Sequence, residues 1–284
     1  MTPSSMSPEK RPRALARALL ALLFWLLVWQ LAAAWVNRAA VSAAMEGGDL
    51  RGALTAALCG RELFLPGIPP VVRALASLAV TPFFWKSALY TLVRVFLGFF
   101  AGAVLGIVLA VLTSSRPALD ALISPAVRVI RAAPVASFIL LLLLWLPTGR
   151  TPAVIAGLIA LPTVWESLHR GLLAVDPLLL EQAEVLHFSP FKALRLVRLP
   201  AALPALLSGC SAALGLAWKS GVAAEVLCQP KYSVGAQIYS AKLRLETPEL
   251  FAWTLLVVLL SLLLERLLRR VLRRAKGVWT DARD

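Results

Sequence analysis

Long apolar blocks constrain this chain more strongly than any other feature of its sequence. Several approach 20 residues, the length that an α-helix needs to cross about 30 Å of hydrocarbon. One soluble domain could not hide so many blocks from water, so the sequence predicts an all-α membrane protein with about six transmembrane helices. The expected spans cover residues 18–36, 87–112, 135–146, 152–172, 203–227 and 250–264.

The third span is the least regular of these. Pro125 and Pro134 interrupt the approach to it, and Arg128 and Arg131 enter it from one side. Prolines are tolerated in a span where neighbouring helices satisfy the freed carbonyls. We therefore expect a broken third helix, of which residues 135–146 are the cleanly apolar part.

The charge balance is strongly basic, with a formal net charge of +14. Such a balance can indicate nucleic-acid binding, but here Lys and Arg lie between and beside the apolar blocks, where they set membrane topology. With an inner N-terminus, the inner segments hold twice as many of the 29 Lys and Arg residues as the outer loops. The sequence thus predicts cytoplasmic N- and C-termini, a lipid environment and no nucleic-acid partner.

This topology divides the chain into three regions. Residues 1–85 comprise a basic tail, the first span and an outer loop that can hold one interfacial helix. Residues 86–270 form the core of spans, with a cytoplasmic loop at 173–203, and residues 271–284 form a basic cytoplasmic tail. The block at 18–36 could instead be a signal peptide, but its length and its three tryptophans favour an uncleaved helix.

Few residues are suited to hold a metal or to carry catalysis. The chain has three cysteines and two histidines, without a Cys-x-x-Cys pair or metal-ligand spacing. We therefore expect no metal, no cofactor and no catalytic residue. Cys59 and Cys228 both fall on the expected outer side and could form a disulfide, although two unlinked thiols are the simpler interpretation.

The second span contains three regularly spaced glycines. Gly98, Gly102 and Gly106 are four residues apart, so they line one face of the expected helix. Small residues at this spacing let another helix backbone approach closely. We interpret them as packing residues and not as ligands.

Four charged residues fall within or near spans, where an unpaired charge is costly. Arg94 and Glu166 are expected to reach the outer and inner interfaces. Lys219 lies deeper, so it either faces a translocation pathway, where it would favour an anion, or pairs with a carboxylate on another helix. Glu225 is a second candidate pathway residue, and its distance of six residues from Lys219 places the two on different helix faces.

The loop at 173–203 carries the strongest functional signal. Asp176 before Pro177 is a good helix start, because Asp accepts free first-turn amides and Pro needs no donor. Ser189-Pro190 breaks that helix and can begin a second one, and Leu199-Pro200 would close the loop. We expect two short helices at a sharp angle on the cytoplasmic face.

The order of residues in this loop is distinctive: Glu181-Gln182-Ala183, three residues, His187, nine residues, Val197-Arg198-Leu199-Pro200. It resembles the signature loop of ABC importer permeases, which is Glu-Ala-Ala, three residues, Gly, nine residues, Ile-x-Leu-Pro. Gln182 and Val197 are mild departures. His187 is the larger one, because Gly enters a left-handed turn without steric cost whereas His is strained there, which leaves the geometry of the turn open.

Three further stretches resemble the nitrate/sulfonate/taurine branch of these permeases, at residues 92–99, at 131–136, and at 217–220 with 223–225. The resemblance covers roughly residues 65–270 and implies a type I ABC importer permease fold. It also implies partners: a second permease copy, cytoplasmic ABC ATPase subunits and an extracytoplasmic solute-binding protein. The chain itself lacks a P-loop, since Lys86-Ser87 and Lys219-Ser220 each follow Trp and not a Gly loop.

The resemblance also implies roles for the loop residues. The first loop helix would dock into a groove on the ATPase and carry its ATP-driven closure to the spans. Glu181 would help to fix the docked helix, Ala183 would allow close approach, and Pro200 would set the angle into the fifth span. Ser189 would begin the second loop helix.

Two other classes of function stay open. A membrane-embedded enzyme such as a lipid-modifying transferase would need clustered carboxylates or histidines at a membrane face, and the sequence has no such cluster. A secondary transporter or channel would need no ATPase, and it would have no reason to carry the 173–203 loop. Nitrate, sulfonates, taurine and vitamin-precursor pyrimidines all fit as substrates.

Overall fold

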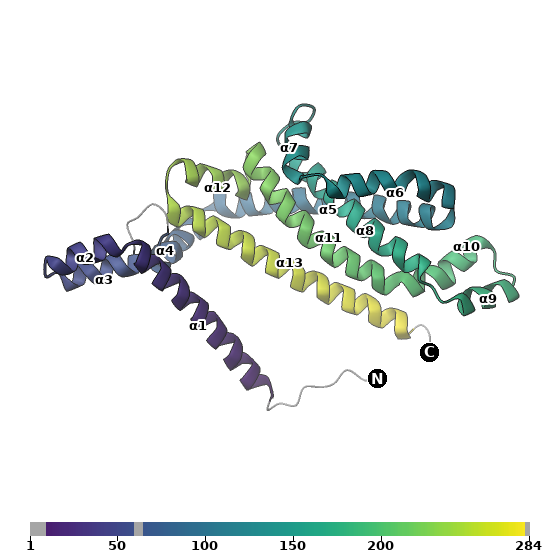
Figure 1. The fold of residues 1–284 in the computed structure, drawn as a ribbon, viewed down its shortest axis with the longest axis horizontal. Coiled ribbons are helices and arrows are strands. Elements are labelled where there is room, and N and C mark those ends of the chain that lie inside the picture. Colours follow the sequence, from purple (N-terminus) through teal and green to yellow (C-terminus); the bar gives the residue numbers. More distant parts are fainter. Residues whose placement is uncertain (1–9, 60–64, 282–284) are drawn as a thin grey trace. The chain divides into compact units, whose positions relative to one another are not determined.

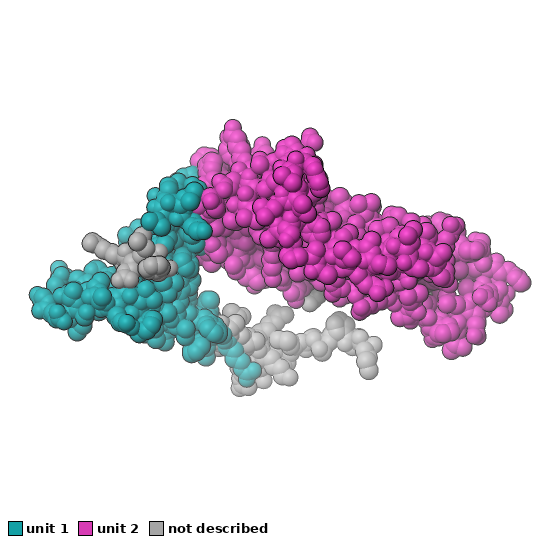
Figure 2. Space-filling model, turned by 45° about the horizontal axis from the view of Figure 1, so that its top comes forward, with its two compact units in different colours: residues 1–81, 240–253 teal, residues 82–239, 254–284 magenta. Residues whose placement is uncertain are grey.

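A computed structural model describes residues 10–59 and 65–281, and every element in these ranges is helical (Figure 1). The chain divides into two compact units, coloured teal and magenta in Figure 2. The first comprises residues 1–81 and 240–253, and the second comprises residues 82–239 and 254–284. Each unit is described by itself.

The first unit begins with α1 (Lys10–Val36), which contains the expected first span. Polar side chains near its C-terminal end hold the following segments. Trp29 Nε1 donates to the carbonyl of Pro66 at 3.1 Å, and Gln30 donates to the carbonyl of Ala57 at 2.8 Å. Gln30 Oε1 also accepts from the amide of Ile68 at 3.1 Å. One α1 side chain therefore joins two later segments of this unit.

The region after α1 is more helical than the sequence predicted. A loop with one interfacial helix was expected, but the structure has three helices there: α2 (Arg38–Glu46), α3 (Leu50–Cys59) and α4 (Ile68–Ala79). They are short because Gly47-Gly48 and Pro66-Gly67 interrupt alanine- and leucine-rich runs. Tertiary contacts with α1 supply the stability that helices of this length lack alone.

The second unit contains the core. Its long helices α5 (Pro82–Ser115), α8 (Thr151–Leu173) and α11 (Leu199–Cys228) run side by side (Figure 1). The part of α13 (Thr247–Asp281) that belongs to this unit packs on α11, where Trp218 Nε1 donates to the carbonyl of Val257 at 3.3 Å. The shared core is apolar and includes Val95, Phe99, Val164, Leu214, Trp218 and Leu264.

The glycines of α5 lie where α8 comes closest. A Cβ on Gly98 would stand 1.9 Å from the carbonyl oxygen of Ala153, and one on Gly102 would stand 2.2 Å from that of Gly157. At Gly106 the corresponding distance to the carbonyl oxygen of Leu161 is 2.7 Å. The absence of a side chain at these positions therefore lets two backbones pack against each other.

The irregular third span consists of α6 (Pro117–Ala132) and α7 (Val135–Leu143), which meet at an angle of 96°. Pro134 lies at the break, as expected, because it cannot donate to the preceding turn. Pro125 stays inside α6 without ending it. Five helices in the described part of the chain are long and apolar enough to cross a membrane, and the number is six if this bent pair is counted as one span.

The fifth span differs from its prediction. Leu199-Pro200 was expected to close the cytoplasmic loop, but α10 (Pro190–Ala193) continues through a π-helical turn (Leu194–Arg198) into α11. The wider π turn lies directly before Pro200, which lacks an amide and would clash with a regular preceding turn. The expected angle at Pro200 is therefore replaced by one continuous 39-residue span.

Candidate functional site

The first helix of the 173–203 loop is α9 (Pro177–Val185). It begins as predicted, because the Asp176 carboxylate accepts from the amide of Leu178 at 2.9 Å. Glu181 and Gln182 are exposed on it, whereas Ala183 is only 4% exposed. The small Ala183 side chain is thus packed inside the loop, and the surface that it can offer to a partner is small.

The turn after α9 is formed by His187, which has a φ of +49° in the left-handed region. The amide of Phe188 donates to the carbonyl of Ala183, and that of His187 donates to the carbonyl of Glu184, both at 2.9 Å. This pair of bonds is the Schellman arrangement that usually ends a helix at glycine. His187 therefore adopts the left-handed conformation in which glycine usually ends a helix.

The second loop helix, α10, begins at Pro190, after Ser189 accepts from the amide of Lys192 at 3.4 Å. The surface of the loop carries large apolar side chains that nothing in the described chain covers, namely Leu178 at 63%, Val185 at 77%, Leu186 at 64% and Phe191 at 71% exposed. A cavity of about 460 Å³ lies between the two loop helices. Four large exposed apolar side chains on one short loop make it a candidate surface for protein association.

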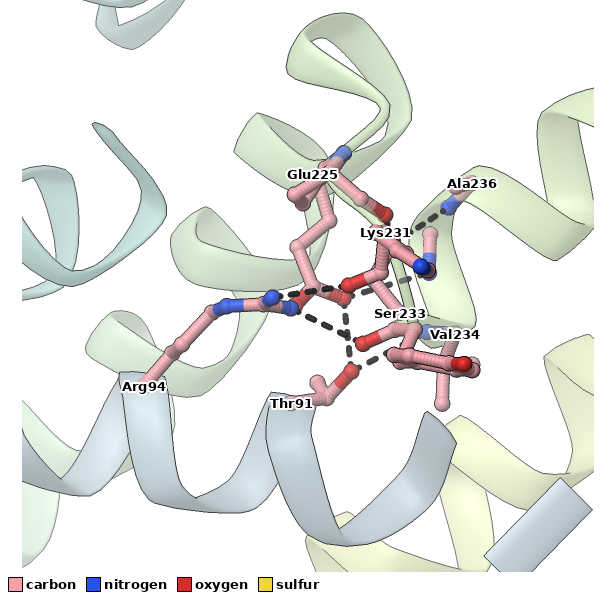
Figure 3. Close-up of polar contacts among 10 residues, drawn as sticks. Thr91, Arg94, Glu225, Lys231, Ser233, Val234 and Ala236 are labelled. Carbon is pink, nitrogen blue, oxygen red and sulfur yellow. Dashed lines mark hydrogen bonds and ion pairs between the residues drawn. The ribbon is translucent and has the colours of Figure 1, made fainter. Parts of the chain in front are cut away.

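A second polar site lies within the helical core and centres on Glu225 of α11, which is completely buried (Figure 3). Arg94 of α5 lies 3.2 Å from one carboxylate oxygen. The other oxygen accepts from the Thr91 hydroxyl at 2.7 Å and from the amide of Gly235 at 3.2 Å. The carboxylate is thus satisfied on both oxygens, which lets it remain buried.

This site corrects the prediction for Arg94 and shows the surroundings of Glu225. Arg94 does not simply extend to the interface, because its guanidinium is bonded to Glu225 and to backbone carbonyls. Glu225 was a candidate pathway residue, and here its side chain is enclosed with both carboxylate oxygens bonded. The sequence signal for this pair was one Arg and one Glu in separate apolar spans, because burying either charge alone in a span is costly. Their pairing depends on helix register, which the sequence left open.

Arg94 also fixes the turn between α11 and α12 (Val234–Leu243). It donates to the carbonyl of Tyr232 at 2.9 Å and to that of Lys231 at 2.8 Å. Thr91 accepts from the amide of Val234 at 3.0 Å (Figure 3). Two residues of this turn have left-handed backbones, with φ of 48° at Gln229 and 52° at Tyr232. The α5 side chains therefore hold a turn that its own residues do not favour.

Lys219 lies apart from this network. It is exposed on α11, on the same helix face as Ala212, Leu216 and Ala223. Among the described residues no carboxylate pairs with it, so these residues offer no partner for a structural ion pair. A lysine cannot face hydrocarbon at this depth without a large cost.

A polar cluster that the sequence did not predict lies between α6 and α8. Glu166 does not reach the interface alone, because it pairs with Arg131 and Arg170. Beside it, His169 is stacked on Trp165 and lies 3.0 Å from the Thr113 hydroxyl. A cavity of about 350 Å³ opens here between α6 and α8. The described residues contain no group of three or more His, Cys, Asp or Glu that could hold a metal ion, and Cys59 and Cys228 are free thiols.

The chain is similar to known transport proteins over most of its length. Residues 102–277 match the family described as binding-protein-dependent transport system inner membrane component. The taurine transport system permease protein TauC of Escherichia coli (strain K12) is 28% identical over 206 residues, covering 70% of this chain and 74% of TauC. The putative aliphatic sulfonates transport permease protein SsuC of Bacillus subtilis (strain 168) is 32% identical over 162 residues, covering 56% of this chain and 58% of SsuC.

Solved structures share the fold. An amino acid ABC transporter with histidines aligns with a TM-score of 0.58 at 20% identity, covering 72% of this chain and 97% of that one. An inward-facing form of the MetNI methionine ABC transporter aligns with a TM-score of 0.55 at 20% identity, covering 73% and 96%. The predicted all-α permease fold is therefore confirmed. Taken with the family match, this chain belongs to the binding-protein-dependent transport system inner membrane components, the membrane-spanning permease subunits of ABC transporters.

Proposed function

We propose that this chain forms, with a second copy of itself, the translocation pathway of an ATP-driven importer, and that its 173–203 loop couples the pathway to a cytoplasmic ATPase. The observation that carries the proposal is the exposed apolar surface on α9 and α10, which is held in shape by the cap at Asp176 and the turn at His187. A loop that merely connected two spans in water would gain nothing from exposing Val185 and Phe191.

The coupling would be mechanical. The π turn joins α10 to α11 without a break, so a displacement of the docked loop is passed directly to a helix that reaches the opposite end of the core. ATP binding closes the ATPase pair and favours one arrangement of the spans, and release of hydrolysis products favours the other. An extracytoplasmic binding protein supplies the solute. In this scheme both termini and the loop lie on the cytoplasmic side.

The proposed substrate is a small anionic or zwitterionic solute such as a sulfonate, taurine or nitrate. The relatives named for taurine and aliphatic sulfonates support this class. Lys219 supports it from within the chain, because an exposed lysine among small and apolar α11 residues requires water or a partner subunit opposite it. The pathway between two copies would provide that water.

The loop can be tested by co-purification with the candidate ATPase. We expect wild-type protein to retain the ATPase in detergent and a variant lacking residues 181–199 to lose it. Glu181→Ala should weaken retention, because it removes an exposed charge from the docking helix. Arg150→Ala, an exposed substitution outside the loop, serves as the control. Retention that is equal with and without the loop would favour an ATPase-independent secondary transporter or channel.

Lys219 can be tested by uptake in proteoliposomes. Lys219→Met keeps the length of the side chain but removes its charge, so anion uptake should fall about tenfold while expression stays normal. Lys219→Arg keeps the charge and should restore most of the uptake. Unchanged transport by the Met variant would remove Lys219 from the pathway.

A further inference from the structure

A cluster of aromatic and cationic side chains surrounds Tyr232 at the start of α5 and at the α11–α12 turn. We call it the Tyr232 patch, and it consists of Phe83, Lys86, Tyr90, Lys231 and Tyr232. The ammonium groups of Lys86 and Lys231 lie 4.2 and 5.2 Å from the centre of the Tyr232 ring. The rings of Tyr90 and Phe83 lie 5.7 and 5.8 Å from it. All five residues belong to the second unit.

The charge of this surface has one sign. Lys86 and Lys231 are exposed, and Phe83 and Tyr90 are more than 40% exposed beside them. The acidic residue bonded to this turn is Glu225, which is completely buried and engaged by Arg94, Thr91 and Gly235. The patch therefore presents two cations and several aromatic faces, and its compensating carboxylate is withdrawn from the surface.

Two buried or partly buried side chains of α5 hold the backbone of the patch in place. Arg94 holds the carbonyls of Lys231 and Tyr232, and Thr91 holds the amide of Val234 (Figure 3). This framework keeps Tyr232 in a left-handed conformation that a tyrosine rarely adopts. Strained residues persist where surrounding contacts over-determine them, and such residues concentrate at functional surfaces.

The patch lies at the N-terminal end of α5, a helix that is longer than the hydrocarbon core is thick. The helix has 34 residues and is therefore about 51 Å long, whereas the hydrocarbon core is about 30 Å thick. Phe83, Lys86 and Tyr90 all lie within the first nine residues of this helix. Lys86 folds over the Tyr232 ring, whereas a lysine that anchors a span extends toward the headgroups.

We propose that the Tyr232 patch is the docking surface for an acidic face of the extracytoplasmic solute-binding protein. This inference rests on the proposed function, which places the start of α5 on the outer side. Carboxylates of the partner would meet Lys86 and Lys231, while the Tyr90 and Tyr232 rings supply rigid contact area. Tyrosine is among the residue types that are enriched where binding at protein interfaces is strongest, and the two lysines supply charge complementarity to an acidic partner.

The test uses the complete transporter, reconstituted in nanodiscs with its ATPase, and measures ATP hydrolysis against the concentration of the purified binding protein. Lys86→Glu/Lys231→Glu should raise the half-maximal concentration at least about tenfold, because reversed charges repel the acidic face. Arg150→Glu, an exposed cation outside the patch, should leave it unchanged. Poly-L-glutamate should compete with the binding protein on the wild type and not on the double variant.

The outcomes distinguish a failure of the proposed function from a failure of the docking surface alone. If the wild type fails to retain the ATPase, the proposed function fails and the patch has no role of this kind. If the ATPase is retained but the double variant responds to the binding protein like the wild type, only the docking surface is overturned. A double variant that loses membrane-inserted protein, while Arg150→Glu does not, would assign the patch to lipid headgroups and also overturn the proposal.

Discussion

Replacing Gly98 with alanine should lower the stability of the folded permease by about 3 kcal/mol, although only one methyl group is added. The new Cβ would stand 1.9 Å from the carbonyl oxygen of Ala153, and real Cβ atoms essentially never come within 3.0 Å of another atom in this way. The obstructing atom is backbone, so no side chain can turn aside. The seam between α5 and α8 must open, and close-packed interiors do not absorb such a shift locally.

The control is Gly215→Ala on α11, where the added methyl meets nothing within 4 Å. Alanine is favoured over glycine in a helix by about 1 kcal/mol, so this variant should be neutral or slightly more stable. Thermal unfolding of the purified proteins separates the two effects, with a decrease in Tm of roughly 6–12 °C expected for Gly98→Ala. Equal Tm values for both variants would show that the seam is looser than its backbone distances indicate.

Much of the fold could be predicted because its main determinants are local. A run of about 20 apolar residues commits a segment to a membrane helix whatever its neighbours do, since every backbone polar group must be satisfied within the segment. The spacing of the glycines in α5 also predicted close helix packing. The sequence did not identify Ala153 and Gly157 of α8 as the residues that pack against them. The partner of a packing face depends on how helices are arranged, which local pattern does not determine.

Local sequence rules were insufficient at three places in the chain. Glycine and proline between residues 37 and 85 suggested a loop, but Gln30 and Trp29 of α1 bind the segments and the helices form. Pro200 suggested a break, but the π turn before it accommodates the missing amide. At His187, where the sequence left the geometry of the turn open, two backbone hydrogen bonds accompany the left-handed backbone. Tertiary contacts decided the first case, whereas backbone hydrogen bonding within the turn accounts for the other two.

Arg94→Ala should be more damaging than Glu225→Ala, although the two residues form one ion pair. The Glu225 side chain is completely buried, whereas that of Arg94 is 15% exposed and also binds two backbone carbonyls. Losing Arg94 leaves a carboxylate enclosed without its cation, at an expected cost of about 3–5 kcal/mol. Losing Glu225 leaves a cation that still has carbonyl partners and access to water, so the cost should be about half as large.

The double variant distinguishes an ion pair from two independent contributions. In Arg94→Ala/Glu225→Ala no buried charge is left without a partner, so the double variant should be about as stable as Glu225→Ala alone. Its loss of stability should therefore be well below the sum of the two single losses. Thermal unfolding in nanodiscs provides the measurement, with Arg150→Ala as an exposed control that should be neutral. Additive losses would show that Arg94 acts mainly through the carbonyls of Lys231 and Tyr232, and not through the Glu225 carboxylate.

Arg94→Lys examines the geometry of this site separately from its charge. Lysine keeps the cation near Glu225, but its compact ammonium group cannot match the planar fork with which the guanidinium reaches the carboxylate and both carbonyls. Stability should therefore recover only in part, and the Gln229–Ser233 turn should become more sensitive to limited proteolysis. Full recovery by lysine would mean that charge alone holds the turn, in which case the left-handed Tyr232 backbone would need another source of support.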